Sequence, residues 1–222
     1  MRLARLFAAD TPTLAGVKFP PQVTSIPYAD VFGWLGMYAN EQSLPVHGWC
    51  VTPQGLYLLC TPPSIKQLST VMQSVGRHLA AVVDMGPIFL GRYKTALIEP
   101  EAWVLPTLVW LEQAPVRLNL VQQAQDWRWS SAQQHVGAVG RLTPWLVDHP
   151  DYWACGNTPF DRQARYKSIL SDGIRVQTLQ SIEAALHGQW ALGSPAFLQN
   201  MNLVASRRAS PAQRGRPKKN GL

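Results

Sequence analysis

The feature that most constrains the fold is a pair of short apolar runs joined by a turn-forming segment. The runs are Val46–Val51 and Leu56–Cys60, and residues 52–55 (Thr-Pro-Gln-Gly) separate them. Apolar runs of this length around Pro and Gly predict a β-hairpin. Helical patterns flank the hairpin. Residues 28–41 carry one apolar stripe, and Ser64 opens a helix with a second stripe (Ile65, Leu68, Met72, Val75, Leu79 and Val82).

The rest of the chain continues this mixture of strands and helices. Residues 88–98 predict a strand, and a helix from Pro100 to about Gln113 follows. Pro106 lies inside that helix and predicts a kink or a late start, because its ring removes one amide donor. A further helix is expected after Ser131, and the chain is helical and loop-rich from Gly140 onward. This order predicts an α+β fold, an antiparallel sheet with helices on one face.

Composition excludes several classes of protein. Of 222 residues, 46% are apolar and nine are Trp, which excludes a disordered or fibrous chain. No apolar run approaches the roughly 18 residues of a membrane span, so no membrane partner is expected. The apolar stretch at the start of the chain is too short for a signal peptide. The three Cys lack metal-finger spacing, which predicts a reducing, cytoplasmic location.

The positive charge is concentrated near the end of the chain. The net charge is +7, and residues 207–222 hold six basic residues and no acidic one. Residues 1–206 therefore carry 14 basic and 13 acidic residues, a balance of +1. The basic tail suggests a polyanionic partner, whereas the remainder of the chain is not a basic globule.

A series of short motifs runs along most of the chain. They are Val46-His47-Gly48-Trp49, Gly91-Arg92-Tyr93-Lys94, Ala114-Pro115-Val116-Arg117, Trp129-Ser130-Ser131, Tyr166-Lys167, Trp190 to Ser194 with Phe197, and Arg214-Gly215-Arg216-Pro217-Lys218. In this order and spacing the chain resembles the REP-associated tyrosine transposases, a branch of the single-strand DNA transposases.

That resemblance implies a ferredoxin-like catalytic fold that binds DNA hairpins and their single-stranded flanks. In the family, two histidines spaced His-x-His on one strand hold a divalent metal that polarises the scissile phosphate. A tyrosine on the following helix attacks the phosphate and becomes covalently linked to DNA. An Asn or Gln one helical turn after the tyrosine commonly completes the metal shell.

This chain differs from the family at all four positions. Gly55 and Tyr57 stand where the two histidines are expected, Trp110 replaces the tyrosine, and Ala114 replaces the Asn or Gln. Glycine has no side chain, a protonated tyrosine is a poor ligand, and neither indole nor alanine supplies the required oxygen. We therefore interpret the chain as a catalytically degenerate relative that uses no metal or other cofactor.

A displaced active site is the alternative interpretation. It would use Tyr57 or Tyr93 as the nucleophile and His47 as a metal ligand. The other histidines form no i, i+2 or i, i+4 pair. A strand histidine and two structural tyrosines are favoured instead.

Three cations are candidate contacts to DNA phosphates. Arg92 and Lys94 are expected to share one face of the strand predicted over residues 88–98. Arg117 follows a proline at a helix end, where its guanidinium can contact a phosphate or bond the last carbonyls of the helix.

Two serines and three tryptophans have alternative structural roles. Ser130 and Ser131 precede an apolar run, so they can cap a helix or receive a phosphate at its N-terminus. Trp127, Trp129 and Trp145 can stack on unpaired bases, although packing in the core is favoured.

The tail contains a motif with a defined mode of DNA binding. Arg214-Gly215-Arg216 before a proline resembles an AT-hook, in which glycine lets the backbone approach the floor of the A·T-rich minor groove. Lys218 and Lys219 add cations for phosphates, and the tail is expected to supply much of the non-specific affinity.

Together these features predict three segments and one leading function. The segments are residues 1–136 (transposase-like domain), 137–206 (helical extension) and 207–222 (disordered basic tail). The leading hypothesis is a bacterial, non-catalytic DNA-binding regulator associated with the nucleoid. The alternatives are an active transposase with displaced residues and a protein-interaction module with a protein partner.

Overall fold

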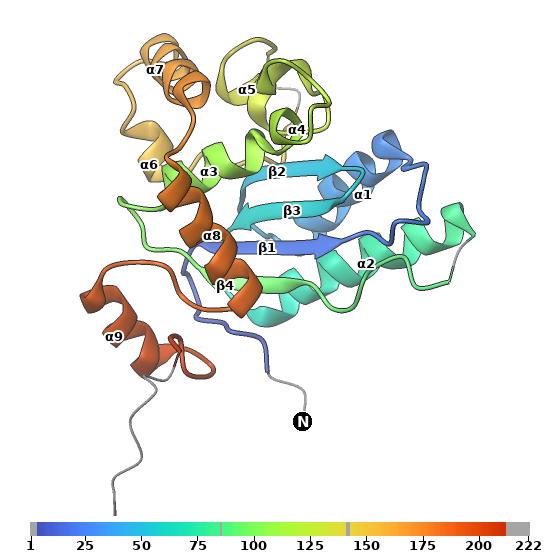
Figure 1. The fold of residues 1–222 in the computed structure, drawn as a ribbon, viewed down its shortest axis with the longest axis horizontal. Helices are drawn as coiled ribbons and strands as arrows, with labels where there is room; N and C mark the ends of the chain where they lie inside the picture. The colour runs from blue at the N-terminus through green and yellow to red at the C-terminus, as the bar shows by residue number, and fades with distance from the viewer. Residues whose placement is uncertain (1–3, 85, 141–142, 212–222) are drawn as a thin grey trace, which may run out of the picture.

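The computed structural model describes residues 4–84, 86–140 and 143–211. Its centre is a four-stranded antiparallel sheet in the order β2-β3-β1-β4. The strands are β1 (Thr13–Lys18), β2 (Val46–Thr52), β3 (Gly55–Cys60) and β4 (Lys94–Leu97). Helices α1 (Tyr28–Glu41) and α2 (Ile65–Val83) connect them in the order β1-α1-β2-β3-α2-β4, which is the ferredoxin-like arrangement (Figure 1). The predicted α+β class is confirmed.

The hairpin and the helix after it form for local reasons. β2 and β3 pair from Val46 with Cys60 to Thr52 with Gly55, and the Thr52 hydroxyl accepts the Gln54 amide at 3.2 Å in the turn. At the start of α2, the Gln67 side-chain oxygen accepts the Ser64 amide at 2.8 Å, which satisfies a donor that the helix itself leaves unpaired.

Helices cover both faces of the sheet. Neighbouring residues of a strand point to opposite faces, so Ala15 and Leu58 pack against α1 and α2. Leu14 and Leu59 pack against a second layer, made by α3 (Val104–Glu112) and α8 (Val176–Gly188) (Figure 1). The sequence patterns placed helices on one face, and the second layer comes from later in the chain.

Two elements near the middle of the chain are shorter than the sequence predicted. α3 begins at Val104, and Pro106 is its third residue, where the missing amide has no partner to lose. The predicted late start is therefore confirmed. β4 begins only at Lys94, because Gly91 has a positive φ of 84° and the chain is irregular before it.

The remaining elements surround this frame. They are α4 (Ala114–Arg117), the 3₁₀ turn η1 (Ala124–Asp126), α5 (Ala132–His135), α6 (Pro150–Trp153), α7 (Pro159–Asp172) and α9 (Pro195–Val204). In the described ranges no helix has the length and apolarity that crossing a bilayer requires.

The segment after α9 returns to the start of the chain. The Ser206 amide donates to the Phe7 carbonyl at 2.7 Å, and the Arg207 Nε donates to the Ala4 carbonyl at 2.7 Å. The Arg207 guanidinium also lies over the Trp190 ring at 5.1 Å. Residues 207–211 thus pack on the fold, whereas the sequence predicted disorder from residue 207.

Candidate nucleic-acid interface

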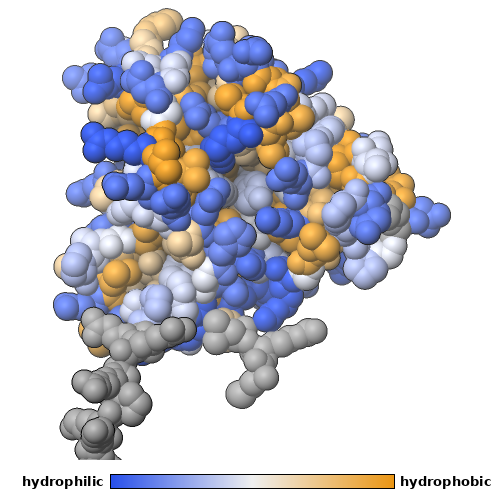
Figure 2. All heavy atoms as spheres, viewed as in Figure 1, coloured by the Kyte–Doolittle hydropathy of each residue, from blue (hydrophilic) through white to orange (hydrophobic). Residues whose placement is uncertain are grey.

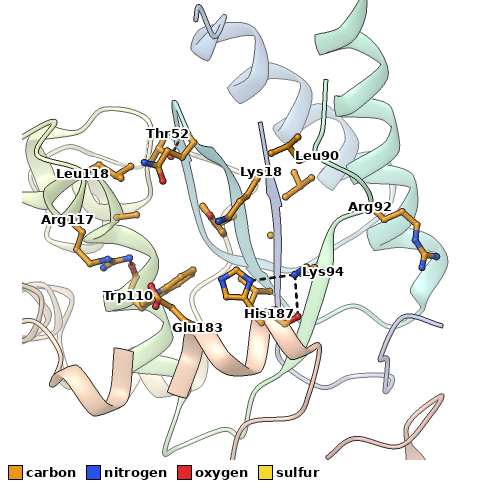
Figure 3. Close-up of a pocket in the computed structure, with 16 residues that line it drawn as sticks. Lys18, Thr52, Leu90, Arg92, Lys94, Trp110, Arg117, Leu118, Glu183 and His187 are labelled. Atoms are coloured by element: carbon orange, nitrogen blue, oxygen red, sulfur yellow. Dashed lines mark hydrogen bonds between the residues drawn. The ribbon is translucent and has the colours of Figure 1, made fainter. Parts of the chain in front are cut away.

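A cleft of about 440 Å³ opens on the face of the sheet that α3 and α8 cover (Figure 3). Strands β1, β3 and β4 form its floor, and the C-terminal end of α3, α4 and α8 form its walls. Its titratable and aromatic lining includes Lys18, Tyr57, Lys94, Trp110, Arg117, Glu183 and His187. On the face seen in Figure 2, hydrophilic and hydrophobic residues are interspersed.

The resemblance to the transposases assigns four positions to catalytic residues, and two of them, 57 and 110, meet inside this cleft. The rings of Tyr57 and Trp110 lie edge to face, with centroids 5.3 Å apart and an interplanar angle of 87°. Gly16 on β1 makes room for the tyrosine, because a Cβ at that position would lie 2.7 Å from the Tyr57 Cδ1. Ala114 lines the same cleft. The fold therefore brings positions 57, 110 and 114 together, but their side chains form an apolar contact.

The remaining family position has no room for a side chain. A Cβ on Gly55 would lie 2.3 Å from the Val17 carbonyl oxygen, a backbone atom of the neighbouring strand. Burial also raises the pKa of Tyr57, so its phenol stays protonated at neutral pH. Within the described part of the chain, no group of three or more His, Cys, Asp or Glu side chains is arranged to hold a metal ion.

Lys94 is fixed at the edge of the cleft by the end of α8. Its ammonium donates to the His187 carbonyl at 3.3 Å and lies 3.5 Å from the His187 Nδ1 (Figure 3). Lys18, on the neighbouring strand, is exposed at the same opening. Desolvation, followed by the charges of Lys94 and Lys18, lowers the pKa of His187. The imidazole is therefore neutral at pH 7 between two cations.

The sequence left two roles open for Arg117, a bond to a carbonyl at the end of a helix and a contact with a DNA phosphate. In the structure its guanidinium bonds a carbonyl of α3 and also lines the cleft. One of its nitrogens, Nη2, donates to the Trp110 carbonyl at 2.6 Å, and the guanidinium lies over the indole at 5.3 Å. Its other terminal nitrogen, Nη1, and the Trp110 Nε1 are both buried with no acceptor among the described residues. Two hydrogen-bond donors in the wall of the cleft are thus unsatisfied.

Arg92 does not share a strand face with Lys94, which corrects the sequence prediction. It precedes β4, is exposed, and points away from Lys94 and His187 (Figure 3). Tyr93 between them is buried, with its hydroxyl 2.8 Å from the Ser69 hydroxyl. The positive φ of Gly91 ends the strand geometry on which the predicted alternation depended.

Ser130 and Ser131 are buried, so the predicted phosphate contact is not available to them. The Ser131 hydroxyl accepts the Trp49 amide at 3.1 Å and donates to the Glu112 carboxylate at 2.5 Å. The Ser130 hydroxyl donates to the Trp127 carbonyl at 3.2 Å. Ser131 thus joins the segment before α5 to β2 and α3, whereas the Ser130 hydroxyl bonds within that segment.

The tryptophans that could have stacked on bases pack within the protein. Trp145 is 6% exposed and belongs to the core on the α1 and α2 side of the sheet. Trp127 and Trp129 are half-buried against Tyr28, with ring centroids 5.7 and 5.5 Å away. The structural role is therefore supported for all three.

His47 has no nitrogen available for a metal. Its Nδ1 donates to the Val147 carbonyl at 2.7 Å, and its Nε2 lies 2.8 Å from the Thr61 hydroxyl. Desolvation lowers the pKa of His47 to about 4. His47 is therefore not available as the metal ligand that a displaced active site would require.

Sequence reasoning missed a buried polar network beneath the cleft. Glu112, the last residue of α3, is fully buried and lies 2.5 Å from the His135 Nδ1. It also accepts the Tyr166 hydroxyl at 2.8 Å, in addition to Ser131. These contacts join α3 to α5 and α7, and so fix the end of the helix that carries Trp110.

Sequence reasoning also missed three residues that line the cleft. Lys18 lies in the segment before the first predicted helix, and Glu183 and His187 lie on α8, far along the chain. No local pattern indicates that these residues meet. The predicted tail contacts, Arg214, Gly215, Arg216, Lys218 and Lys219, lie outside the described residues.

Comparison with known proteins identifies a shared fold. No protein-family model matches the chain, and no curated protein matches it in sequence. Among solved structures, it is similar to a REP-associated tyrosine transposase bound to a REP hairpin, with a TM-score of 0.55 and 15% sequence identity. The match covers 68% of this chain and 93% of that chain. The protein therefore has the fold of a REP-associated tyrosine transposase.

Proposed function

We propose that this protein binds hairpin or single-stranded DNA through a transposase-like fold without cleaving it. One observation carries the proposal. Three of the four positions that correspond to the family's catalytic residues converge on one cleft, yet they contribute only a Tyr57–Trp110 ring contact and a methyl group. The fourth, Gly55, lies on a strand with no room for a side chain. The cleft keeps a cationic rim at Lys18 and Lys94.

The absence of cleavage follows from the chemistry of these side chains. An indole has no oxygen that can attack phosphorus, so Trp110 cannot form the covalent intermediate. Tyr57 brings a hydroxyl to the lining of the cleft, but burial raises its pKa and makes its phenolate harder to form. Without a metal or another group to polarise the phosphate, a tyrosine alone is a weak catalyst.

Binding to DNA is supported by the fold and by the charge distribution. The transposase with the same fold was solved with a REP hairpin bound. In the present chain the segment up to residue 206 is nearly neutral, yet four cations (Lys18, Arg92, Lys94 and Arg117) line one cleft. We assign recognition of the unpaired part of the DNA to this cleft, because only folded residues are held at fixed spacing. The basic tail supplies non-specific affinity.

A single experiment tests both halves of the proposal. A labelled DNA hairpin with single-stranded flanks is titrated with the protein in the presence and absence of Mg²⁺ or Mn²⁺, and each sample is then run on a denaturing gel. We expect metal-independent binding and no covalent adduct. Lys94→Ala should weaken hairpin binding, whereas Lys66→Ala on α2, across the sheet, should not.

The alternative functions correspond to different results. An adduct that disappears in Tyr57→Phe would mean that the protein is an active transposase with a displaced nucleophile. Failure to bind any hairpin or single strand would overturn the DNA-binding proposal. Nuclease-resistant capture of a specific protein would then favour the interaction module.

A further inference from the structure

The cleft contains hydrogen-bond donors that the protein itself does not satisfy. Trp110 is 5% exposed, and its Nε1 has no acceptor among the described residues. The Arg117 Nη1 on the same wall is also buried and has no acceptor among the described residues. Buried polar groups are normally paired, and an unpaired donor is costly. Both nitrogens are closed to solvent, so an acceptor oxygen of a ligand reaches them only when side chains of the wall shift.

The charges around these donors favour an anion. Lys18, Lys94 and Arg117 line the cleft, and in the ranges that the structure describes none of them forms an ion pair with a carboxylate. Glu183 is the acidic residue of the lining and opposes the three cations in part. His187 also lines the cleft, but its lowered pKa leaves it neutral at pH 7, so it adds no charge there. These cations line the same cleft as the two residues that carry the unpaired donors.

The size of the cleft restricts the ligand to one small group. A volume of about 440 Å³ lies within the range of sites that bind small molecules, roughly 300–1,000 Å³. A base-paired duplex does not fit such a volume, whereas one unpaired nucleotide does.

The number of cations and donors indicates the kind of phosphate. A phosphodiester in a strand carries one negative charge, and a phosphomonoester carries about −1.5 to −2 at pH 7, with three strong acceptor oxygens. Lys18, Lys94 and Arg117 against Glu183 sum to +2, which matches the charge of the monoester better than the single charge of a diester.

We propose that the cleft binds a phosphomonoester, carried either by the end of a DNA strand or by a free nucleotide. This inference rests on the proposed function for its ligand class and deepens it. The protein would then distinguish a phosphorylated strand end from an internal segment of the same sequence. Lys18 and Lys94 would contact the phosphate at the opening, and Arg117 and Trp110 would donate to its oxygens from the wall.

The test compares identical single strands that differ only at one end. Short labelled strands bearing a 5′-phosphate, a 3′-phosphate or only hydroxyl ends are titrated by fluorescence anisotropy. We expect at least one phosphorylated strand to bind about tenfold more tightly than the hydroxyl strand. Thymidine monophosphate should compete for the site, and thymidine should not. If thymidine monophosphate competes but the three strands bind equally, the phosphomonoester that the cleft binds belongs to a free nucleotide.

Matched variants connect the preference to the cleft. Lys18→Met should remove most of the phosphate preference; Lys18 is exposed, so this change spares the Lys94 contact to α8. Glu183→Gln should strengthen binding of the phosphorylated strand, because it removes the opposing charge. Lys66→Met, on the other helical layer, should change neither.

Each outcome has a distinct meaning. Equal affinity for all three strands, with no competition by thymidine monophosphate, would overturn this inference. If the hairpin still bound in that case, the proposed function would stand without it. Binding of thymidine monophosphate without any hairpin binding would support the cleft site and overturn the proposed function.

Discussion

The substitution Gly55→Ala tests whether this fold can carry a side chain at the position where the resemblance to the transposases places the first histidine. The added Cβ would lie 2.3 Å from the Val17 carbonyl oxygen and 3.2 Å from the Lys18 Cα. Both are backbone atoms of β1, which is paired with β3 over six residue pairs and cannot rotate away. An ordinary carbon–oxygen contact is about 3.3 Å or longer, so the strands must separate by about 1 Å.

The expected cost follows from that separation. Overpacking a well-packed site costs about 1–3 kcal/mol, and weakening a ladder hydrogen bond adds about 1 kcal/mol. We therefore expect a loss of about 2–4 kcal/mol in the free energy of unfolding. For a chain of this size that corresponds to a fall of about 4–16 °C in melting temperature. Thermal unfolding followed by circular dichroism measures it.

A second glycine provides the control. Gly33 lies in the exposed part of α1, and a Cβ there would meet no atom within 4 Å. Gly33→Ala should leave the melting temperature unchanged or raise it slightly, since Ala is the better helix former by up to about 1 kcal/mol. If Gly55→Ala melted at or above the temperature of the unaltered protein, the argument that position 55 cannot hold a ligand would fail.

The same reasoning applies to metal binding. Millimolar Mg²⁺ or Mn²⁺ should leave the melting temperature of the unaltered protein unchanged, because a ligand stabilises a protein only through a site in the native state. A metal-dependent rise that vanished in Tyr57→Phe would show that a site exists after all.

Three further predictions concern the buried network, a buried histidine and the tail. Tyr166→Phe removes the hydroxyl bond to Glu112 and should cost about 1–3 kcal/mol, measured by denaturant unfolding; an unchanged midpoint would count against the network. The folded-state pKa of His47 is about 4 and its unfolded value is 6.5, so unfolded chains bind more protons between these pH values. Stability should therefore fall by up to about 3 kcal/mol as pH drops from 6.5 to 4, and His47→Gln should flatten that profile. Deleting residues 212–222, which spares Arg207, should flatten the log–log salt dependence of duplex binding by about 3 to 4 if its four cations contact phosphates; an unchanged slope would contradict this role.

Local sequence patterns predicted much of the fold. The hairpin, α1 and α2 each follow from a period of apolar residues and from turn or cap residues that lie next to each other in the chain. The late start of α3 followed from the backbone chemistry of Pro106 alone. The strand predicted over residues 88–98 was too long, because composition does not reveal the positive φ at Gly91.

The candidate site was predictable only where motif order carried the information. Tyr57, Trp110 and Ala114 were assigned to one site from their sequence positions, and all three line the same cleft. The exposed or buried state of each side chain was not predictable in this way. Ser131 and Lys94 both looked accessible, but the first is buried against Glu112, and the second is held by the end of α8.

The sequence by itself determined the hairpin, the two helices that flank it and the residue types at positions 55, 57, 110 and 114, since these depend on residue identity and on near neighbours. Tertiary structure decided which distant residues meet. β1 became a central strand of the sheet, α8 closed one wall of the cleft, and Glu112 joined three helices. Such contacts span many tens of residues, and they form because packing both faces of the sheet buries more apolar surface than any local pattern specifies.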